Sequence, residues 1–404
     1  MRRIYLDNAA TTPVDPRVLK AMVPYFSEKF GNPSSLHAEG GEAKEAIEKA
    51  RAIVAGALGS AADEVIFTAG GTEADNLAIK GAAWANKKKG NHLVTSVFEH
   101  AAVLNTFKYL EKNGFMVTYV PVDREGIVKL DALEKAVTKE TTLVSIMHAN
   151  NEIGTVQPLK EIAEIAKKRG AAFHTDAVQS FGKIKTDVNE LGADLLSVSA
   201  HKIYGPKGVG ALFARKGIAL EPLLHGGEQE RGLRSGTENV AGIVGLGEAT
   251  ALCLKEMKRE AARETRLRDK LIKGVLETRD SWLNGHAAKR LPNNANFSFS
   301  YVEGESLILY LDMKGIAGST GSACSSHKLE PSHVLSAIGL SPEEAHGSLR
   351  LTLGRWTTET DIDTALEAIP IEVEKLRKMS PMAGMSASER ERLSKQPHEH
   401  GNAC

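Results

Sequence analysis

Short apolar runs alternate with amphipathic segments along most of the chain. Apolar runs bounded by turn-forming residues predict buried strands, and apolar positions three or four residues apart predict helices. The predicted strands are residues 4–6, 65–68, 92–96, 116–120, 143–147, 171–176, 195–198 and 209–214. The predicted helices are residues 15–26, 42–58, 73–85, 103–112, 130–137 and 160–169. Strands that alternate with helices in this way indicate an α/β fold with a mainly parallel sheet.

The pattern changes in the last third of the chain. Residues 252–278 form a long charged amphipathic segment, which predicts a single helix and a natural hinge between two domains. A smaller α+β part follows, with strands near 296–300 and 349–353 and helices near 304–312 and 361–377. Residues 381–404 lose the apolar pattern, so we expect a flexible C-terminal tail. Its histidines and Cys404 leave a metal or thiol role open.

Composition excludes several function classes. The 404 residues include 51 Lys+Arg and 51 Asp+Glu, and this zero net charge argues against a general nucleic-acid or anionic-membrane surface. No apolar run reaches the roughly 18 residues of a membrane span. Asp7 lies too close to the N-terminus for the apolar stretch of a signal peptide to precede it. Three widely spaced cysteines give neither a disulfide framework nor a CxxC metal site. We therefore expect a protein of the reducing cytoplasm without a bound metal.

Polar residues follow several predicted strands, where open α/β sheets bind ligands. Gly70, Gly71 and Thr72 lie between a strand and a helix, which suits either a phosphate cradle or a tight turn. His100 follows another strand, and it could stack on an aromatic cofactor or cap the next helix. Asp176 ends a further strand, where a carboxylate could hold a pyridine nitrogen protonated.

The segment 194–208 carries Ser199, His201 and Lys202 where a buried strand runs into a Gly-Pro turn. A lysine at a strand end beside phosphate-binding groups suits pyridoxal phosphate, because its amine can condense with the cofactor aldehyde. The alternative is a lysine on an exposed turn. Cys324 lies among small polar residues at 317–332, which favours a reactive thiol over core packing.

Taken together, these stretches resemble the NifS/IscS-type cysteine desulfurases, which are class V, fold-type I pyridoxal phosphate enzymes. The resemblance runs from Tyr5 to about Pro381 and is carried by these segments: 5–13 (YLDNAATTP), 70–73 (GGTE), 99–100 (EH), 150–154 (NNEIG), 174–179 (HTDAVQ), 199–202 (SAHK), 234–237 (RSGT) and 321–324 (GSAC). It implies a large cofactor-binding domain at 17–257 with a mainly parallel seven-stranded sheet. A small domain would comprise 1–16 and 258–380 and carry the cysteine loop at 318–332.

The resemblance also implies a role for each matching residue. Lys202 would be the Schiff-base lysine, Cys324 the catalytic thiol, and His100 a ring-stacking residue and candidate proton acceptor. The remaining cofactor-binding residues would be Gly71, Thr72, Ser199 and His201 at the phosphate, Asp176 and Gln179 at the ring, and Thr237 at the phosphate of a partner subunit's cofactor. Asn151 and Arg350 would bind the substrate carboxylate, for which a planar guanidinium is well shaped.

The implied reaction converts L-cysteine to L-alanine and leaves a persulfide on Cys324. The implied partners are a second copy of the chain, forming a homodimer, and an iron–sulfur scaffold protein of the IscU/NifU type as sulfur acceptor. Cys324 could ligate an iron–sulfur cluster only during that transfer. A selenocysteine lyase, another class V enzyme of this fold, or a non-catalytic sulfur-assembly scaffold remain open as alternatives.

Overall fold

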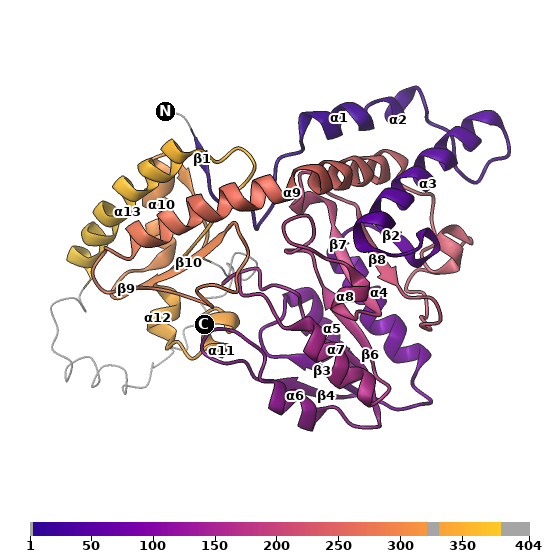
Figure 1. The fold of residues 1–404 in the computed structure, drawn as a ribbon, viewed down its shortest axis with the longest axis horizontal. Coiled ribbons are helices and arrows are strands. Elements are labelled where there is room, and N and C mark those ends of the chain that lie inside the picture. The colour runs from indigo at the N-terminus through magenta and orange to yellow at the C-terminus, as the bar shows by residue number, and fades with distance from the viewer. Residues whose placement is uncertain (1–2, 321–330, 381–404) are drawn as a thin grey trace, which may run out of the picture.

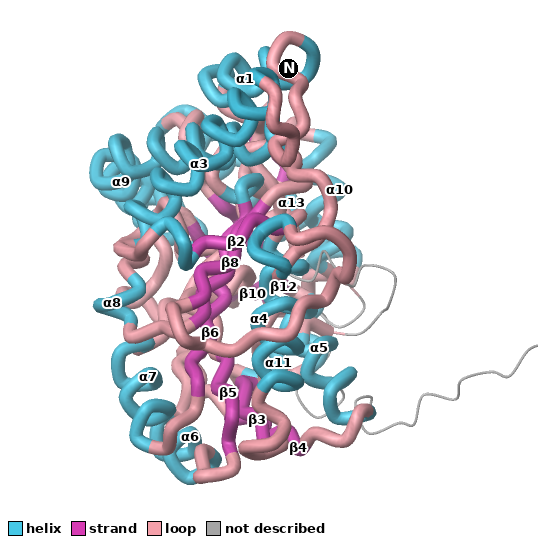
Figure 2. Tube along the Cα trace, turned by 90° about the vertical axis from the view of Figure 1, so that its right-hand side faces the viewer, coloured by secondary structure: helices cyan, strands magenta, loops and turns pink. Residues whose placement is uncertain are grey.

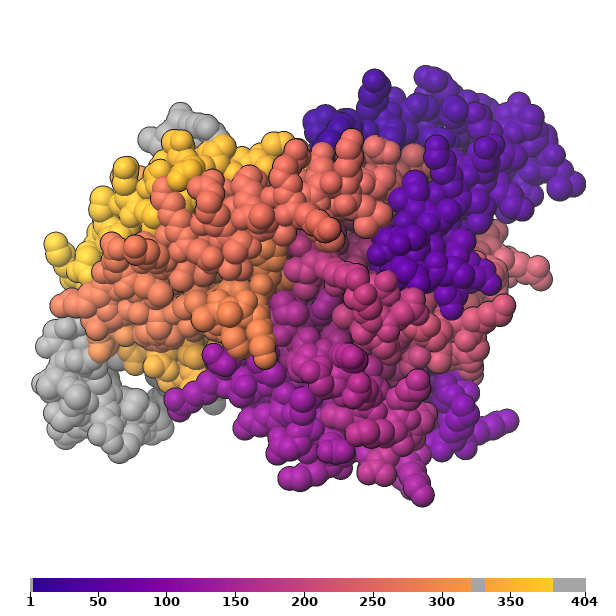
Figure 3. All heavy atoms as spheres, viewed as in Figure 1, coloured from indigo at the N-terminus to yellow at the C-terminus, as the bar shows by residue number. Residues whose placement is uncertain are grey.

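The computed structural model describes residues 3–320 and 331–380. Figure 1 shows two lobes bridged by one long helix, α9 (Val240–Val275). In the space-filling view of Figure 3, the coral surface of α9 lies between the indigo N-terminal helices and the yellow C-terminal helix. Among the described helices, none combines the length and the apolar character needed to cross a membrane.

A seven-stranded sheet forms the centre of the larger lobe. Its strands are β2 (Val65–Thr68), β3 (His92–Ser96), β4 (Met116–Val120), β5 (Thr141–Ser145), β6 (Ala172–Asp176), β7 (Leu195–Ser199) and β8 (Gly210–Ala214). The spatial order is β2-β8-β7-β6-β5-β3-β4. Only β8 runs antiparallel to its neighbours in this sheet. The predicted seven-stranded, mainly parallel sheet is therefore confirmed.

Helices cover both faces of this sheet, as the tube view of Figure 2 shows. One face packs on α4 (Gly71–Ala85) and α5 (Ala101–Lys112). The other face packs on these helices: α1 (Pro16–Met22), α3 (Ala38–Leu58), α6 (Leu130–Ala136), α7 (Leu159–Lys168), α8 (Val188–Leu191) and the first half of α9. Leu195 and Leu196 are consecutive yet belong to opposite core clusters. Side chains on a strand alternate between faces, so a sheet covered on both sides needs such continuous apolar runs.

The smaller lobe combines the two ends of the described chain. Its strands are β1 (Ile4–Tyr5), β9 (Ser281–Leu283), β10 (Asn294–Phe299), β11 (Ile316–Ala317) and β12 (Ser348–Thr352). Its helices are α10 (Gly304–Met313), α11 (His333–Ala337), α12 (Pro342–His346) and α13 (Glu359–Met379). β1 pairs in parallel with β11, whereas β10 lies between β9 and β12 in an antiparallel sheet. The second half of α9 packs into this lobe's core through Leu267, Leu271 and Val275.

Several predicted boundaries were wrong. The helix predicted from 15 to 26 is two helices, α1 and α2 (Pro24–Ser27), because a proline at position 24 has no N–H to continue the first one. The long helix begins at Val240 and not near Leu252. β9 and β11 were not predicted, and three short 3-10 helices also lie in loops: η1 (Ala62–Glu64), η2 (Ala200–Lys202) and η3 (Gln229–Gly232). The domain boundaries stay a prediction.

The outer edge of β2 is covered by side chains. Arg51 Nη1 and Arg231 Nη2 each donate to the Val65 carbonyl, at 2.9 and 2.8 Å. Phe67 N donates to Glu230 Oε2 at 2.8 Å, and Arg51 forms a bidentate ion pair with Glu230, both bonds 2.7 Å long. Glu230 and Arg231 have φ values of 46° and 58°, in the left-handed region. This buried ion pair therefore holds a strained loop against the sheet.

Candidate active site

The carboxyl ends of five strands meet at one edge of the large sheet. β3, β5, β6 and β7 are parallel, and β2 has the same direction because β8 runs antiparallel to both β2 and β7. The sequence-predicted residues follow these strand ends, and ligands of open α/β sheets bind at such an edge. The strand directions thus bring segments from 70 to 202 to one place.

A cavity of about 850 Å³ opens at this edge. Its lining includes the four residues predicted to hold a phosphate: Gly71, Thr72, Ser199 and His201. Thr11 and Lys207 also line it, and His201 Nδ1 lies 3.1 Å from Thr11 Oγ1. Three hydroxyl groups and a lysine beside a glycine turn form a polar cavity suited to an anion.

The glycine turn packs closely against Val178 and Ser199, which follow β6 and end β7. α4 begins at Gly71, directly after Gly70 with a φ of 153°. A Cβ at position 71 would lie 2.7 Å from Val178 Cγ2 and 3.5 Å from Ser199 Cβ. The first amides of a helix have no acceptor within the helix, so they are available to an anion that approaches. This cradle fits the phosphate of pyridoxal phosphate.

The N-terminal segment connects Lys202 with Gln179. Lys202 Nζ donates to the carbonyls of Ala9 and Ala10, at 2.5 and 2.7 Å. Gln179 Nε2 donates to the same Ala9 carbonyl at 3.0 Å. Lys202 lies in η2 just after β7, and Gln179 follows β6. Two of the predicted site residues therefore meet on one backbone oxygen.

Asp176 and His100 follow the ends of β6 and β3, and their charges interact. Asp176 is buried, and its Oδ1 accepts a hydrogen bond from Val178 N at 2.8 Å. Burial raises the pKa of Asp176, while positive charge on His100 and Lys202 acts in the opposite direction. A buried carboxylate of this kind favours a cationic partner, and the N–H of a protonated pyridine ring is one.

His100 is the N-cap of α5, and its Nδ1 accepts a hydrogen bond from Ala102 N at 3.1 Å. The neutral ring therefore carries its proton on Nε2. Burial lowers the pKa of His100, which favours this neutral form, while the charge of Asp176 raises it. The predicted helix cap is confirmed, and capping leaves the other ring nitrogen available to a ligand.

Asn151 and Arg350 come together across the two lobes. Arg350 belongs to β12, and its Nη1 donates to the Asn151 carbonyl at 3.0 Å. Its Nη2 donates to Asp7 Oδ1 at 2.8 Å. Arg350 Nε and Asn151 Oδ1 are buried and have no hydrogen-bond partner within residues 3–320 and 331–380. A buried donor and acceptor without partners can both be satisfied by a small polar ligand.

Two predicted residues are not part of this geometry. Thr237 lies on an exposed loop after η3 and does not line the cavity described above. Cys324 and most of the predicted cysteine loop lie outside the described residues, as does the predicted tail at 381–404. The roles of Thr237 and Cys324 stay predictions.

Sequence analysis missed several residues that contact the site. Asp7 was quoted only as part of a motif, yet it forms the ion pair with Arg350. Glu99 is buried beside β5, where it accepts hydrogen bonds from Ser96 Oγ and Met147 N, and burial raises its pKa to about 8. Lys183 was not considered at all.

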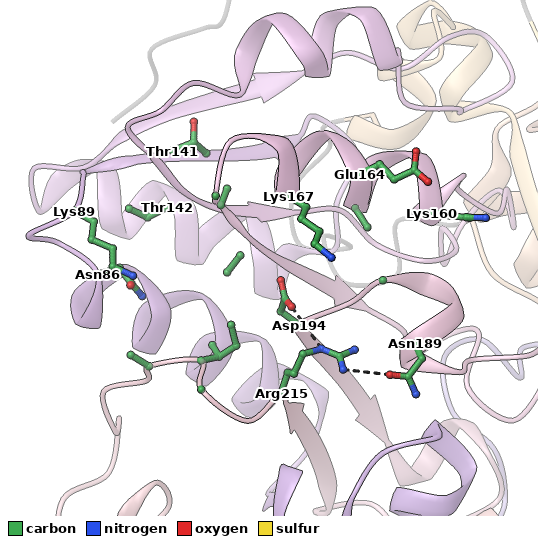
Figure 4. Close-up of a pocket in the computed structure, with 18 of the residues that line it drawn as sticks. Asn86, Lys89, Thr141, Thr142, Lys160, Glu164, Lys167, Asn189, Asp194 and Arg215 are labelled. Atoms are coloured by element: carbon green, nitrogen blue, oxygen red, sulfur yellow. Dashed lines mark hydrogen bonds and ion pairs between the residues drawn. The ribbon is translucent and has the colours of Figure 1, made fainter.

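A second cavity of about 710 Å³ lies at the opposite edge of the sheet (Figure 4). Thr141 and Ala172, which line it, begin β5 and β6, so this is the amino edge. In Figure 4 Arg215 is joined by dashed lines to Asp194 and Asn189. None of the twelve predicted site residues lines this cavity. The carboxyl edge is therefore the better candidate.

Comparisons with known proteins agree with this geometry. A "Cysteine desulfurase IscS" of Dictyoglomus turgidum is 58% identical over 382 residues, which cover 94% of this chain and 97% of the relative. One of Methanosarcina thermophila is 56% identical over 381 residues, covering 94% of each. A solved "NIFS-LIKE PROTEIN" is 43% identical with a TM-score of 0.87, and the match covers 92% of this chain and 100% of that one.

A NifS-like protein from Rickettsia africae aligns with a TM-score of 0.84 at 33% identity, over 92% of this chain and 100% of that one. The profile of the family "Aminotransferase class-V" matches residues 4–365. Members of this family depend on pyridoxal phosphate, and the predicted fold-type I architecture is confirmed. The chain belongs to the class-V aminotransferase family and, within it, to the NifS/IscS-type branch.

Proposed function

We propose that this protein is a pyridoxal-phosphate-dependent cysteine desulfurase. It would convert L-cysteine to L-alanine and transfer the sulfur to Cys324 as a persulfide. The relatives named cysteine desulfurase support this, at 54 to 58% identity over 94% of the chain. The observation that carries the proposal is the meeting of Lys202, Asp176 and His100 at one sheet edge, with Arg350 reaching the same edge from the smaller lobe.

Each part of the cofactor has candidate residues. The phosphate would be held by Gly71, Thr72, Ser199 and His201, which line the 850 Å³ cavity. Asp176 would pair with the ring nitrogen, Gln179 would donate to the ring oxygen, and His100 would stack on the ring. When bound, pyridoxal phosphate supplies an aldehyde for the substrate amine and a ring that accepts electrons from the substrate Cα.

The substrate carboxylate would bind where Arg350 and Asn151 have polar atoms without partners. Asp7 would keep the Arg350 guanidinium fixed through their 2.8 Å bond. Lys202 would then remove the Cα proton of the substrate with its amine. A positioned proton acceptor of this kind typically contributes about 10²–10⁴-fold in rate.

Sulfur transfer would follow as attack of the Cys324 thiolate on the substrate sulfur. An S–S bond forms as the substrate Cβ–S bond breaks, and the electron pair of that bond passes to the carbon fragment, which takes up protons to become alanine. His100 would accept the proton of the substrate thiol at Nδ1, the ring nitrogen without a proton, once its hydrogen bond from Ala102 N has opened. The balance is L-cysteine plus thiol giving L-alanine plus persulfide, with no external oxidant.

The partners follow the same proposal. The persulfide would pass to an iron–sulfur scaffold protein or another sulfur acceptor. A second copy of this chain would form a homodimer in which Thr237 reaches the partner's cofactor, and its exposure in the single chain is compatible with such a contact. The residues in ranges 3–320 and 331–380 contain no group of three His, Cys, Asp or Glu side chains placed to hold a metal ion. A cytoplasmic location is part of the proposal.

The test is a stoichiometry measured on the purified holoenzyme. Wild type is expected to release one alanine per sulfide from L-cysteine in the presence of a reductant, and Cys324→Ser is expected to release no sulfide. Cys253→Ala is the matched control, because it removes the one cysteine within the described residues, which is buried. A Cys324→Ser variant that works as well as wild type would refute the proposal. Activity confined to selenocysteine would favour the lyase alternative.

A further inference from the structure

Lys183 is a partly buried lysine to which the reaction above gives no role. It lies in the turn after β6, and its Nζ donates to two backbone carbonyls, Gln179 O at 3.0 Å and Lys202 O at 3.3 Å. No carboxylate lies within 4.0 Å of this amine among residues 3–320 and 331–380, so its direct partners are the two carbonyls. The amine therefore joins the exits of two neighbouring strands.

The same two residues also meet at their side chains. Gln179 Nε2 and Lys202 Nζ both donate to the Ala9 carbonyl, at 3.0 and 2.5 Å. Lys183 thus holds the backbones of Gln179 and Lys202, and Ala9 holds their side chains. These four residues form a closed ring of hydrogen bonds. The ring fixes both the backbone position of Lys202 and the position of its amine.

Charged and titratable groups surround the Lys183 amine at longer range. Glu264 and Cys253 of α9 interact electrostatically with it, and so does His201 of η2. Burial lowers the pKa of Lys183 to about 8, and Glu264 acts against that shift. The charge of Lys183 also helps to lower the pKa of His201, after the larger effects of burial, Lys202 and Lys207. The positive charge of Lys183 therefore also affects His201, which lines the proposed phosphate cavity.

We propose that Lys183 is a positioning residue that fixes the backbone of Lys202 relative to Gln179, and so orients the Lys202 amine toward the cofactor aldehyde. The proposal rests on the proposed function, but its main readouts are cofactor affinity and absorbance and not turnover. An ordinary structural lysine would support folding only. A positioning lysine affects the cofactor site without a matching effect on folding.

The experiment compares Lys183→Met and Lys183→Arg with wild type. Methionine keeps the length and removes both the donors and the charge, whereas arginine keeps both. Thr250→Val is the matched control, because Thr250 is a buried residue of α9 whose Oγ1 donates only to its own helix, to Leu246 O at 2.8 Å. Each protein is titrated with pyridoxal phosphate, and the visible absorbance of the holoenzyme is followed against pH. Unfolding of each apoenzyme by urea reports on folding.

In Lys183→Met the Kd for pyridoxal phosphate is expected to rise about tenfold, as for the loss of one charge-assisted hydrogen bond. The pH midpoint of the absorbance is expected to rise, because a positive charge beside the Lys202 backbone has been removed. The apoenzyme's urea midpoint is expected to match wild type, and Lys183→Arg is expected to restore both cofactor readouts. Thr250→Val is expected to change neither of them.

Two results would overturn the inference. One is a Lys183→Met holoenzyme with the Kd and pH midpoint of wild type. The other is a loss of affinity that parallels a lower urea midpoint and is not restored by arginine, which would make Lys183 a purely structural residue. A wild-type protein that binds pyridoxal phosphate but releases no alanine would refute the proposed function instead, so the two failures are distinguishable.

Discussion

Replacing Arg350 by lysine keeps the positive charge of this side chain but removes its planar fork of donors. Arg350 is buried, with 3% of its side chain exposed, and two of its nitrogens are held by Asn151 and Asp7. The remaining Nε has no partner among residues 3–320 and 331–380 and would be available to the substrate carboxylate. A lysine ammonium is a single point charge and cannot keep both existing bonds while also binding the substrate.

The size of the effect follows from the one bond that is lost. A hydrogen bond to a charged group contributes about 1.5–3 kcal/mol, and each 1.4 kcal/mol corresponds to about a factor of ten. We therefore expect kcat/KM for L-cysteine to fall about 10- to 100-fold in Arg350→Lys. Most of the change should appear in KM, because the carboxylate is bound in the ground state as well as in the transition state.

The assay is the initial rate of alanine release over a range of L-cysteine concentrations. Arg377→Lys is the control, since Arg377 is also buried in the smaller lobe but donates to carbonyls of residues 279, 280 and 300, away from Asn151 and Asp7. It is expected to keep the wild-type KM. The reasoning is refuted if Arg350→Lys has the kcat/KM of wild type, or if only kcat falls.

Three further predictions concern the cofactor cradle, pH and the sheet edge. Gly71→Ala is expected to weaken pyridoxal phosphate binding about tenfold, because even a small steric shift disturbs the hydrogen bonds of the cradle; an absorbance titration measures it, and Gly41→Ala, whose Cβ meets nothing within 4 Å, should bind as wild type does. Burial raises the pKa of Glu99 from 4.5 to about 8, so the folded chain keeps a proton that the unfolded chain loses, and this contribution to stability is full below pH 4.5 and is lost as pH rises toward 8. Urea unfolding of Glu99→Gln should therefore show a flatter dependence on pH over that window, and a slope equal to that of wild type would contradict the assignment. Glu230→Ala is expected to lower the free energy of unfolding by about 3–5 kcal/mol, since it removes the buried bidentate partner of Arg51 and leaves only the exposed Glu48 as an ion-pair partner; no change in the urea midpoint would show that the ion pair is not needed.

The strands of the large sheet could be predicted because their apolar runs are continuous. Val65–Thr68, His92–Ser96 and Met116–Val120 were predicted with the boundaries that the structure has. The start of α9 could not be predicted from the sequence, because the glycines at 242, 245 and 247 have poor helix propensity. In the structure a Cβ at Gly247 would lie 2.8 Å from Ala50 Cβ, so close packing of α3 against α9 selects glycine there. Tertiary contact overrides local propensity at such positions.

Part of the candidate site could be predicted because its residues follow the predicted strands, and the rest could not because it depends on tertiary contacts. Asp176, His100 and Lys202 follow strand ends, so the sheet itself collects them. Asp7 and Lys183 could not be assigned, because their partners are fixed only by the tertiary fold. The Asp7–Arg350 pair joins residues 343 positions apart, and no local pattern reports such a contact. Lys183 contacts backbone carbonyls, which every residue has and which no motif distinguishes.

The parallel pairing of β1 with β11 has a consequence for the order of events during synthesis. Ile4 pairs with Ile316, so β1 finds its neighbour only after most of the chain has been made. At about 5–20 residues per second, the ribosome reaches that neighbour roughly 15–60 s after β1 is made. The Ala9 and Ala10 carbonyls that bind the Lys202 amine lie a few residues after β1. The N-terminal segment, although it is made first, is therefore the last part of the candidate site to be fixed in place. A nascent chain that has already folded its large sheet still lacks the backbone carbonyls that bind Lys202.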